Sequence, residues 1–142
     1  MINGAINSNA YNVVLALHLF AVILGTGAAF TAPIVKTKLG NSNGISGVVA
    51  ESFALIMSPA LLLSGIFGGA LVGMSDNVYD FGQMWLTLAG IFWLIAVASA
   101  AILYQPAFLT LPDAEKYKPL LSPALHISLA VMLVVMVWKP GL

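Results

Sequence analysis

Hydrophobic residues are gathered into four long runs, which three short polar segments separate. We place the runs at about residues 13–35, 48–74, 81–104 and 120–138. Each run is close to the ~20 residues with which an α-helix crosses the hydrocarbon core of a bilayer. The runs lack the period-two alternation of a membrane β-strand. The pattern therefore predicts an all-α, polytopic membrane protein with four transmembrane helices in an antiparallel bundle.

Composition agrees with a single membrane domain over residues 1–142. Hydrophobic residues make up 61% of the chain and charged residues 7%, against about 25% charged residues in a soluble domain. The formal net charge is zero, so we expect no nucleic-acid partner. Without cysteine, thiolate metal sites and iron–sulfur clusters are excluded. No basic residue precedes the first run, which we therefore interpret as a retained helix and not as a signal peptide.

The lysines predict an orientation in the membrane. The first polar segment, 36–44, reads as a turn and the third, 105–119, as an interfacial loop; each carries two lysines, whereas segment 75–80 carries two aspartates and no basic residue. Because lysine-rich loops stay in the cytoplasm, we expect the first and third loops inside. Both termini are then outside, and the protein is a multi-pass protein of the cell (inner) membrane. The lysines are Lys36, Lys38, Lys116, Lys118 and Lys139.

Small residues at helical spacing predict close helix packing. Gly65, Gly69 and Gly73 form a stripe in the second run, and Ala96 with Ala100 forms a shorter one in the third. Such stripes let another helix approach the backbone closely. We favour packing inside the bundle, with contact to another membrane subunit or a second copy of the chain as the alternative.

Ionisable residues at membrane depth are the candidates for chemistry, because burying them in lipid is costly. They are His18, Glu51 and His126. Two histidines on different helices suggest axial ligands of haem b. However, a rise of 1.5 Å per residue puts their depths roughly 10–15 Å apart. We therefore expect each histidine to act by itself and not to share one iron.

Each histidine has a predicted set of neighbours at its own depth. At the level of His18 lie Met74, Met84 and Met136, and an imidazole with thioethers suits Cu(I). The alternative is that these methionines are packing residues. At the level of His126 lies Glu51, which suggests a proton relay. Alternatively, Glu51 extends toward the headgroups near its helix N-terminus.

The segment Leu15–Phe30, LALHLFAVILGTGAAF, carries the most specific local pattern. His18 followed by Gly25, Thr26 and Gly27 resembles the first helix of a family of small bacterial integral membrane proteins of unknown function. The segment also resembles the copper-resistance protein D-like family and the haem-linked, membrane-bound protoporphyrinogen oxidase family. Those two families usually carry a Trp where this chain has Gly25. The resemblance implies a four-helix fold and a ligand role for His18.

Three functions remain open at this stage. The first is a non-catalytic accessory subunit of a respiratory or other energy-transducing membrane complex. The second is a haem b- or copper-handling membrane protein that uses His18. The third is a small proton-coupled transporter that uses Glu51 and His126. We predict no catalytic residues and do not expect an enzyme; the expected partners are the lipid bilayer and other membrane subunits or further copies of the chain.

Overall fold

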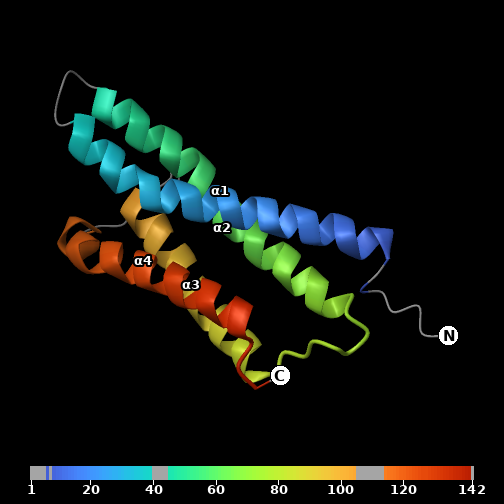
Figure 1. Cartoon of the computed structure of the whole chain (residues 1–142). Helices are drawn as coiled ribbons and strands as arrows, with labels where there is room; N and C mark the ends of the chain where they lie inside the picture. Colours follow the sequence, from blue (N-terminus) through green and yellow to red (C-terminus); the bar gives the residue numbers. More distant parts are fainter. Residues whose placement is uncertain (1–5, 7, 40–44, 105–113, 142) are drawn as a thin grey trace.

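The architecture consists of four long helices (Figure 1). A computed structural model describes residues 6, 8–39, 45–104 and 114–141, without the side chains of residues 45, 46, 50, 51, 114 and 115. The described residues form α1 (Asn9–Leu39), α2 (Ile45–Gly73), α3 (Met84–Tyr104) and α4 (Ala114–Trp138), with no strand among them. All four helices are long and apolar enough to cross a membrane. The predicted all-α, four-helix membrane architecture is confirmed.

Three helices extend beyond their predicted spans: α1, α4 and, by a few residues at its start, α2, whereas α3 begins at Met84 and not at about residue 81. α1 continues to Leu39, so Lys36 and Lys38 occupy its last turn and not the predicted polar turn. Positive charge at a helix C-terminus is favourable because it faces the unpaired carbonyl groups. α4 begins at Ala114 and includes Pro119, inside the predicted loop 105–119, of which residues 105–113 lie outside the described residues. Hydropathy marks where lipid ends, whereas helical hydrogen bonding continues past that boundary.

The helices pack as two pairs. α1 packs mainly along α2, and α3 mainly along α4 (Figure 1). Contact between α2 and α3 joins the pairs, and the contact between α1 and α4 is the smallest of those formed. A single side-chain bond between α1 and α4 therefore carries more weight than one within a pair.

The core combines small residues on α1 and α3 with larger ones on α2 and α4. Ala96 and Ala100 are 0% and 1% exposed, so the predicted alanine stripe is buried. They belong to one cluster with Leu125 and Leu129 of α4, both fully buried. Small residues bring helix backbones together, which increases van der Waals contact, a main attraction between helices in lipid.

The outer surface of the bundle is strongly apolar. Leu55 and Leu120 are each 71% exposed, and Val137 is 81% exposed. In water such a surface would drive association. In a bilayer it faces acyl chains of similar polarity, so its exposure costs little.

Lys139, directly after α4, contacts Tyr79 in the connection between α2 and α3 and Trp85 at the start of α3. Its Nζ donates to the hydroxyl of Tyr79 at 3.0 Å, and lies 4.7 Å from the centre of that ring and 5.5 Å from that of Trp85. Lys139 has a positive φ of 43°, a left-handed conformation more usual for glycine after a helix. The cation–π contacts offset part of this strain. The α2–α3 connection and the C-terminal end of α4 thus lie at the same end of the bundle.

Candidate functional site

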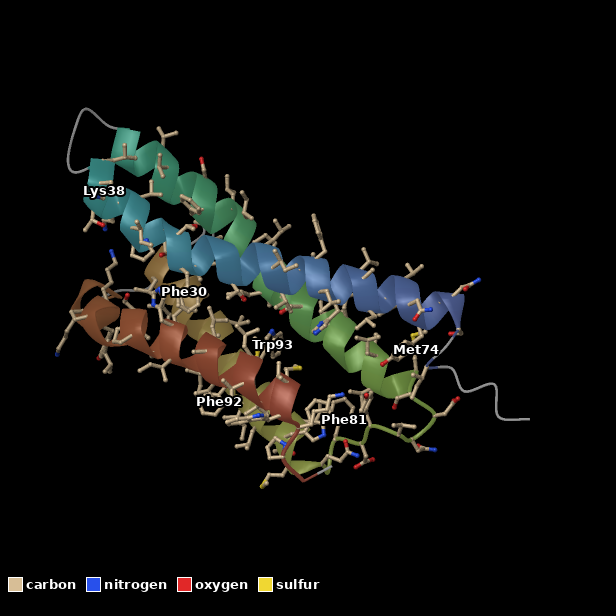
Figure 2. All side chains as sticks on the ribbon, in the orientation of Figure 1. Phe30, Lys38, Met74, Phe81, Phe92 and Trp93 are labelled. Atoms are coloured by element: carbon tan, nitrogen blue, oxygen red, sulfur yellow. The ribbon has the colours of Figure 1, made fainter. Side chains whose placement is uncertain are left out.

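Two aromatic rings from neighbouring helices hydrogen-bond to the backbone of α2. The indole Nε1–H of Trp93 on α3 donates to the carbonyl oxygen of Leu61 at 2.7 Å (Figure 2). The imidazole Nδ1 of His18 on α1 lies 2.8 Å from the carbonyl oxygen of Ser64. Because a carbonyl oxygen only accepts, Nδ1 of His18 is the donor. The segment 61–64 of α2 thus holds both of its neighbouring helices through polar contacts.

A glycine lies beside each ring, four residues after the carbonyl that the ring contacts. A Cβ atom at Gly65 would lie 2.1 Å from the indole of Trp93, and one at Gly68 would lie 3.2 Å from Cε1 of His18. In an α-helix the Cβ atom tilts toward the N-terminus and covers the preceding turn. Glycine at these positions therefore uncovers the carbonyl groups for a second donor.

The geometry of His18 leaves one ring nitrogen available. The side chain is 9% exposed, and among the described residues its Nε2 has no hydrogen-bond partner. In a neutral imidazole, a hydrogen on Nδ1 means that Nε2 presents a lone pair. Metal-bound histidines are commonly held in this way, by donation from the other nitrogen to a carbonyl or carboxylate. His18 can therefore act as a ligand to a metal or haem iron.

His126 on α4 uses both ring nitrogens. Its Nδ1 lies 2.6 Å from the carbonyl oxygen of Ser122, and its Nε2 lies 3.1 Å from the carbonyl oxygen of Ala29 on α1. The ring also packs edge-to-face with Phe30, with centroids 5.1 Å apart; Phe30 is labelled in Figure 2. In contrast to His18, His126 therefore keeps no ring nitrogen for a cofactor in this packing.

The methionines predicted to accompany His18 lie in different surroundings. Met84 is 57% exposed and lies beside Gly141, whereas Met136 is partly buried against the core. Met74 follows the end of α2 (Figure 2). These surroundings do not show the three thioethers converging on His18. The predicted copper site with His18, Met74, Met84 and Met136 stays a prediction.

The predicted proton relay also stays a prediction. Glu51 belongs to α2, but its side chain lies outside the described residues. The hydrogen-bond partners described for His126 are both backbone carbonyl groups. The described surroundings of the His126 ring thus offer backbone carbonyl groups as partners for a bound proton.

The glycine stripe of α2 is divided between a filled part and an open part. Gly65 receives Trp93, whereas a Cβ atom at Gly69 or Gly73 would meet no other atom within 4 Å in the described chain. The predicted stripe thus serves packing inside the bundle at Gly65 alone. Sequence analysis missed Gly68 because a period of four passes over it, although the pair Gly68–Gly69 was the available signal.

The pattern at Gly25–Gly27 serves close packing on one side of α1. A Cβ atom at Gly25 would lie 2.9 Å from Cδ2 and 3.2 Å from the backbone nitrogen of Leu61, while Gly27 faces open space. A tryptophan side chain at position 25 could not fit against α2 here. In the described chain, Oγ1 of Thr26 is buried without a hydrogen-bond partner.

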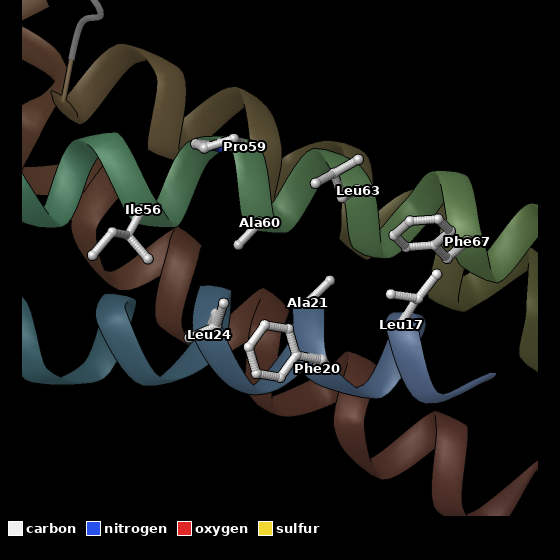
Figure 3. Close-up of a pocket in the computed structure, with 9 residues that line it drawn as sticks. All are labelled: Leu17, Phe20, Ala21, Leu24, Ile56, Pro59, Ala60, Leu63 and Phe67. Carbon is white, nitrogen blue, oxygen red and sulfur yellow. The ribbon is translucent and has the colours of Figure 1, made fainter. Parts of the chain in front are cut away.

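An apolar groove of about 360 Å³ opens between α1 and α2 (Figure 3). The side chains that line it are all apolar, so none of them can form a hydrogen bond that would select a polar ligand. The residues that line it are Leu17, Phe20, Ala21, Leu24, Ile56, Pro59, Ala60, Leu63 and Phe67.

Comparisons with protein-family models, curated proteins and solved structures found no match to this chain.

Proposed function

We propose that this membrane protein is a non-catalytic subunit of a larger membrane complex, which it joins through the C-terminal half of α2. The open part of the glycine stripe, Gly69 and Gly73, supports this proposal, because a Cβ atom added at either position would meet no other helix of the described chain within 4 Å. Bare helix backbone lets a second helix approach closely and gain van der Waals contact. A respiratory or other energy-transducing complex is the class of assembly proposed.

Substitution of the open glycines tests the proposal. Gly69→Leu combined with Gly73→Leu should remove co-purifying subunits in mild detergent, because two leucine side chains would hold a partner helix away. The matched control is Ala70→Leu, which adds a side chain at an exposed position of the same helix. Native mass spectrometry measures the assembly directly. Unchanged assembly in the double variant, or equal loss in the control, would contradict docking at this face.

The lysine distribution supports an orientation for the subunit. Lys36 and Lys38 lie in the last turn of α1, at the opposite end of the bundle from Lys139. With Lys116 and Lys118 near the start of α4, four lysines mark one end and one marks the other. We place the four-lysine end in the cytoplasm and both termini outside, in the inner membrane.

A second function, haem b handling, is favoured by the geometry of His18. The Nδ1 contact to the Ser64 carbonyl leaves the Nε2 lone pair for an axial bond to iron. Because the methionines are not seen to converge on His18, the geometry favours haem over Cu(I).

Optical spectroscopy tests the second function. Haem-loaded protein should show a Soret band near 400 nm that His18→Ala removes, while His126→Ala keeps it, because both nitrogens of His126 already face carbonyl groups. Protein purified from haem-replete cells without a Soret band would contradict haem binding. A band that persists in His18→Ala would contradict the assignment of the ligand.

A further inference from the structure

Two carbonyl oxygens compete for the hydrogen of His126. Its Nδ1 lies 2.6 Å from the Ser122 oxygen and its Nε2 lies 3.1 Å from the Ala29 oxygen. A neutral imidazole carries one N–H, whereas the imidazolium carries two. In the neutral ring, one nitrogen must therefore direct its lone pair at the lone pairs of a carbonyl oxygen. Only the protonated ring donates to both oxygens.

The Ala29 carbonyl has a particular need for this donor. In an α-helix, the carbonyl of residue 29 would accept from the backbone N–H of residue 33. Residue 33 is a proline inside α1 and has no N–H. His126 is thus the donor that the structure provides for this carbonyl. The bond to Ser122, one turn earlier on α4, orients the ring toward α1.

We propose that His126 is a proton-binding site whose protonation ties α1 to α4. The shorter contact, from Nδ1 to the Ser122 oxygen, indicates that the neutral ring carries its hydrogen on Nδ1. A proton taken up from water then adds the bond from Nε2 to the Ala29 oxygen. Loss of the proton removes one of the two bonds. Because the contact between α1 and α4 is the smallest in the bundle, this bond affects how closely those two helices approach each other. The inference is independent of any partner or cofactor of the protein.

The surrounding helices carry other ionisable groups. α1 carries Lys36 and Lys38 beyond Pro33, and α4 carries Lys116, Tyr117 and Lys118 before Ser122. α3 ends at Tyr104, and α2 contributes Glu51, whose side chain lies outside the described residues. Lysine and tyrosine ordinarily titrate near pH 10, and histidine near pH 6.5. Histidine is the side-chain type that ordinarily changes its charge between pH 5 and 8.

The sign of the effect follows from the bonds. The protonated ring makes both bonds, so the α1–α4 contact is tightest at low pH. The contact loosens as the pH rises and the ring loses its proton. Since histidine is the side chain that titrates in the physiological range, acidification of the compartment that reaches His126 should draw α1 and α4 together.

Nuclear magnetic resonance measures the protonation directly. In protein reconstituted into bilayers, the imidazole ¹⁵N signals of His126 should move together to those of a doubly protonated ring as the pH falls from 8 to 5. The matched control is His18, whose Nδ1 alone faces a carbonyl oxygen and whose signals identify it in a His126→Gln variant. A neutral ring at position 126 down to pH 5 would overturn the proposal.

Spin labels measure the consequence for packing. The chain has no cysteine, so spin labels can be attached to cysteines that replace the exposed Ile34 of α1 and Ile127 of α4. The distance between the two labels reports the separation of α1 and α4. The distribution should be narrow and short at pH 5 and broader at pH 8. His126→Gln should remove the pH dependence, because an amide does not titrate in this range. His18→Gln should keep it.

A substitution of Pro33 tests whether the pH dependence comes from the Ala29 carbonyl group or from some other effect of the His126 ring. Pro33→Ala supplies the backbone N–H that the Ala29 carbonyl lacks, and α1 already continues through this position to Leu39. The carbonyl then has a helical donor, so the pH dependence of the label distance should shrink. A pH response of full size in Pro33→Ala would overturn the role of the Ala29 carbonyl. A pH response that survives in His126→Gln would overturn the role of the histidine.

Discussion

His18 and His126 both contact a backbone carbonyl group of a neighbouring helix, but the two carbonyl groups are made accessible in different ways. Both lie on membrane-spanning helices, and both direct ring nitrogens at backbone carbonyl oxygens of another helix. The carbonyl that His18 contacts, that of Ser64, is followed four residues later by Gly68. The carbonyl that His126 contacts, that of Ala29, is followed four residues later by Pro33. In both helices, the residue four positions after the contacted carbonyl group is thus unusual: it lacks either a Cβ atom or a backbone N–H.

The comparison shows that residue i+4 controls access to carbonyl i of a helix. Its Cβ atom covers the carbonyl from the side, and its N–H occupies the oxygen. Glycine removes the cover, as at Gly65 and Gly68, where the rings of Trp93 and His18 enter. Proline removes the competing donor, as at Pro33. In lipid, where water cannot satisfy a ring N–H, such carbonyl groups are the available acceptors.

The largest expected effect is at Gly65. Gly65→Ala places a methyl group 2.1 Å from the indole of Trp93. The indole ring must therefore move away, and its hydrogen bond to the Leu61 carbonyl oxygen is lost. We expect a loss of about 3 kcal/mol or more, above the ordinary range for overpacking. Thermal unfolding in detergent measures it. The control is Gly69→Ala, where the added atom meets nothing within 4 Å; equal effects at both sites would show that Trp93 does not occupy this seat.

The next effect separates the two histidines. His18→Ala should lower stability by about 1–3 kcal/mol through the lost bond and packing, and by more than His126→Ala. The reason is that His18 is buried at 9% exposure, while His126 is only half-buried. Both variants are compared at the same pH. A larger loss in His126→Ala would invert the ranking and place the main polar contact at the α1–α4 junction.

A smaller effect is expected at Gly68. Gly68→Ala places a methyl group 3.2 Å from Cε1 of His18, so the imidazole must move by a few tenths of an ångström. The loss should lie at or below the lower end of the ~1–3 kcal/mol range for overpacking, and below that of Gly65→Ala. Unfolding curves of the two variants under identical conditions give the ratio. A loss as large as that of Gly65→Ala would mean that the His18 ring has no freedom to adjust.

The last prediction concerns orientation and not stability: labelling from one side of the membrane shows which compartment each histidine lies nearer to. Single cysteines replacing Asn43 and Asn77 lie in the first and second polar segments of the sequence. An impermeant maleimide should label only position 77 in intact cells, because lysine-rich segments stay inside. Such labelling would place His126 nearer the cytoplasmic side. Labelling at position 43 alone would invert the orientation, and the external pH would then reach His126 first.

The amino-acid sequence by itself determined the solvent and the helices. Four apolar runs can satisfy their backbone groups in lipid only as helices, and α1 to α4 follow those runs. The sequence also identified His18 and His126 as the costly groups to bury. Depth along each helix could be estimated from the rise per residue, because that quantity depends on backbone geometry alone.

The tertiary structure decided which faces meet. Every face of these helices is apolar, so hydropathy does not report the rotation of a helix about its axis. That rotation separates Met84, which is exposed, from the partly buried Met136 at a similar depth. It also divides the glycine stripe, covering Gly65 and leaving Gly69 open. Which carbonyl each ring reaches depends on the packing of two helices at once, and no single segment of the chain encodes it.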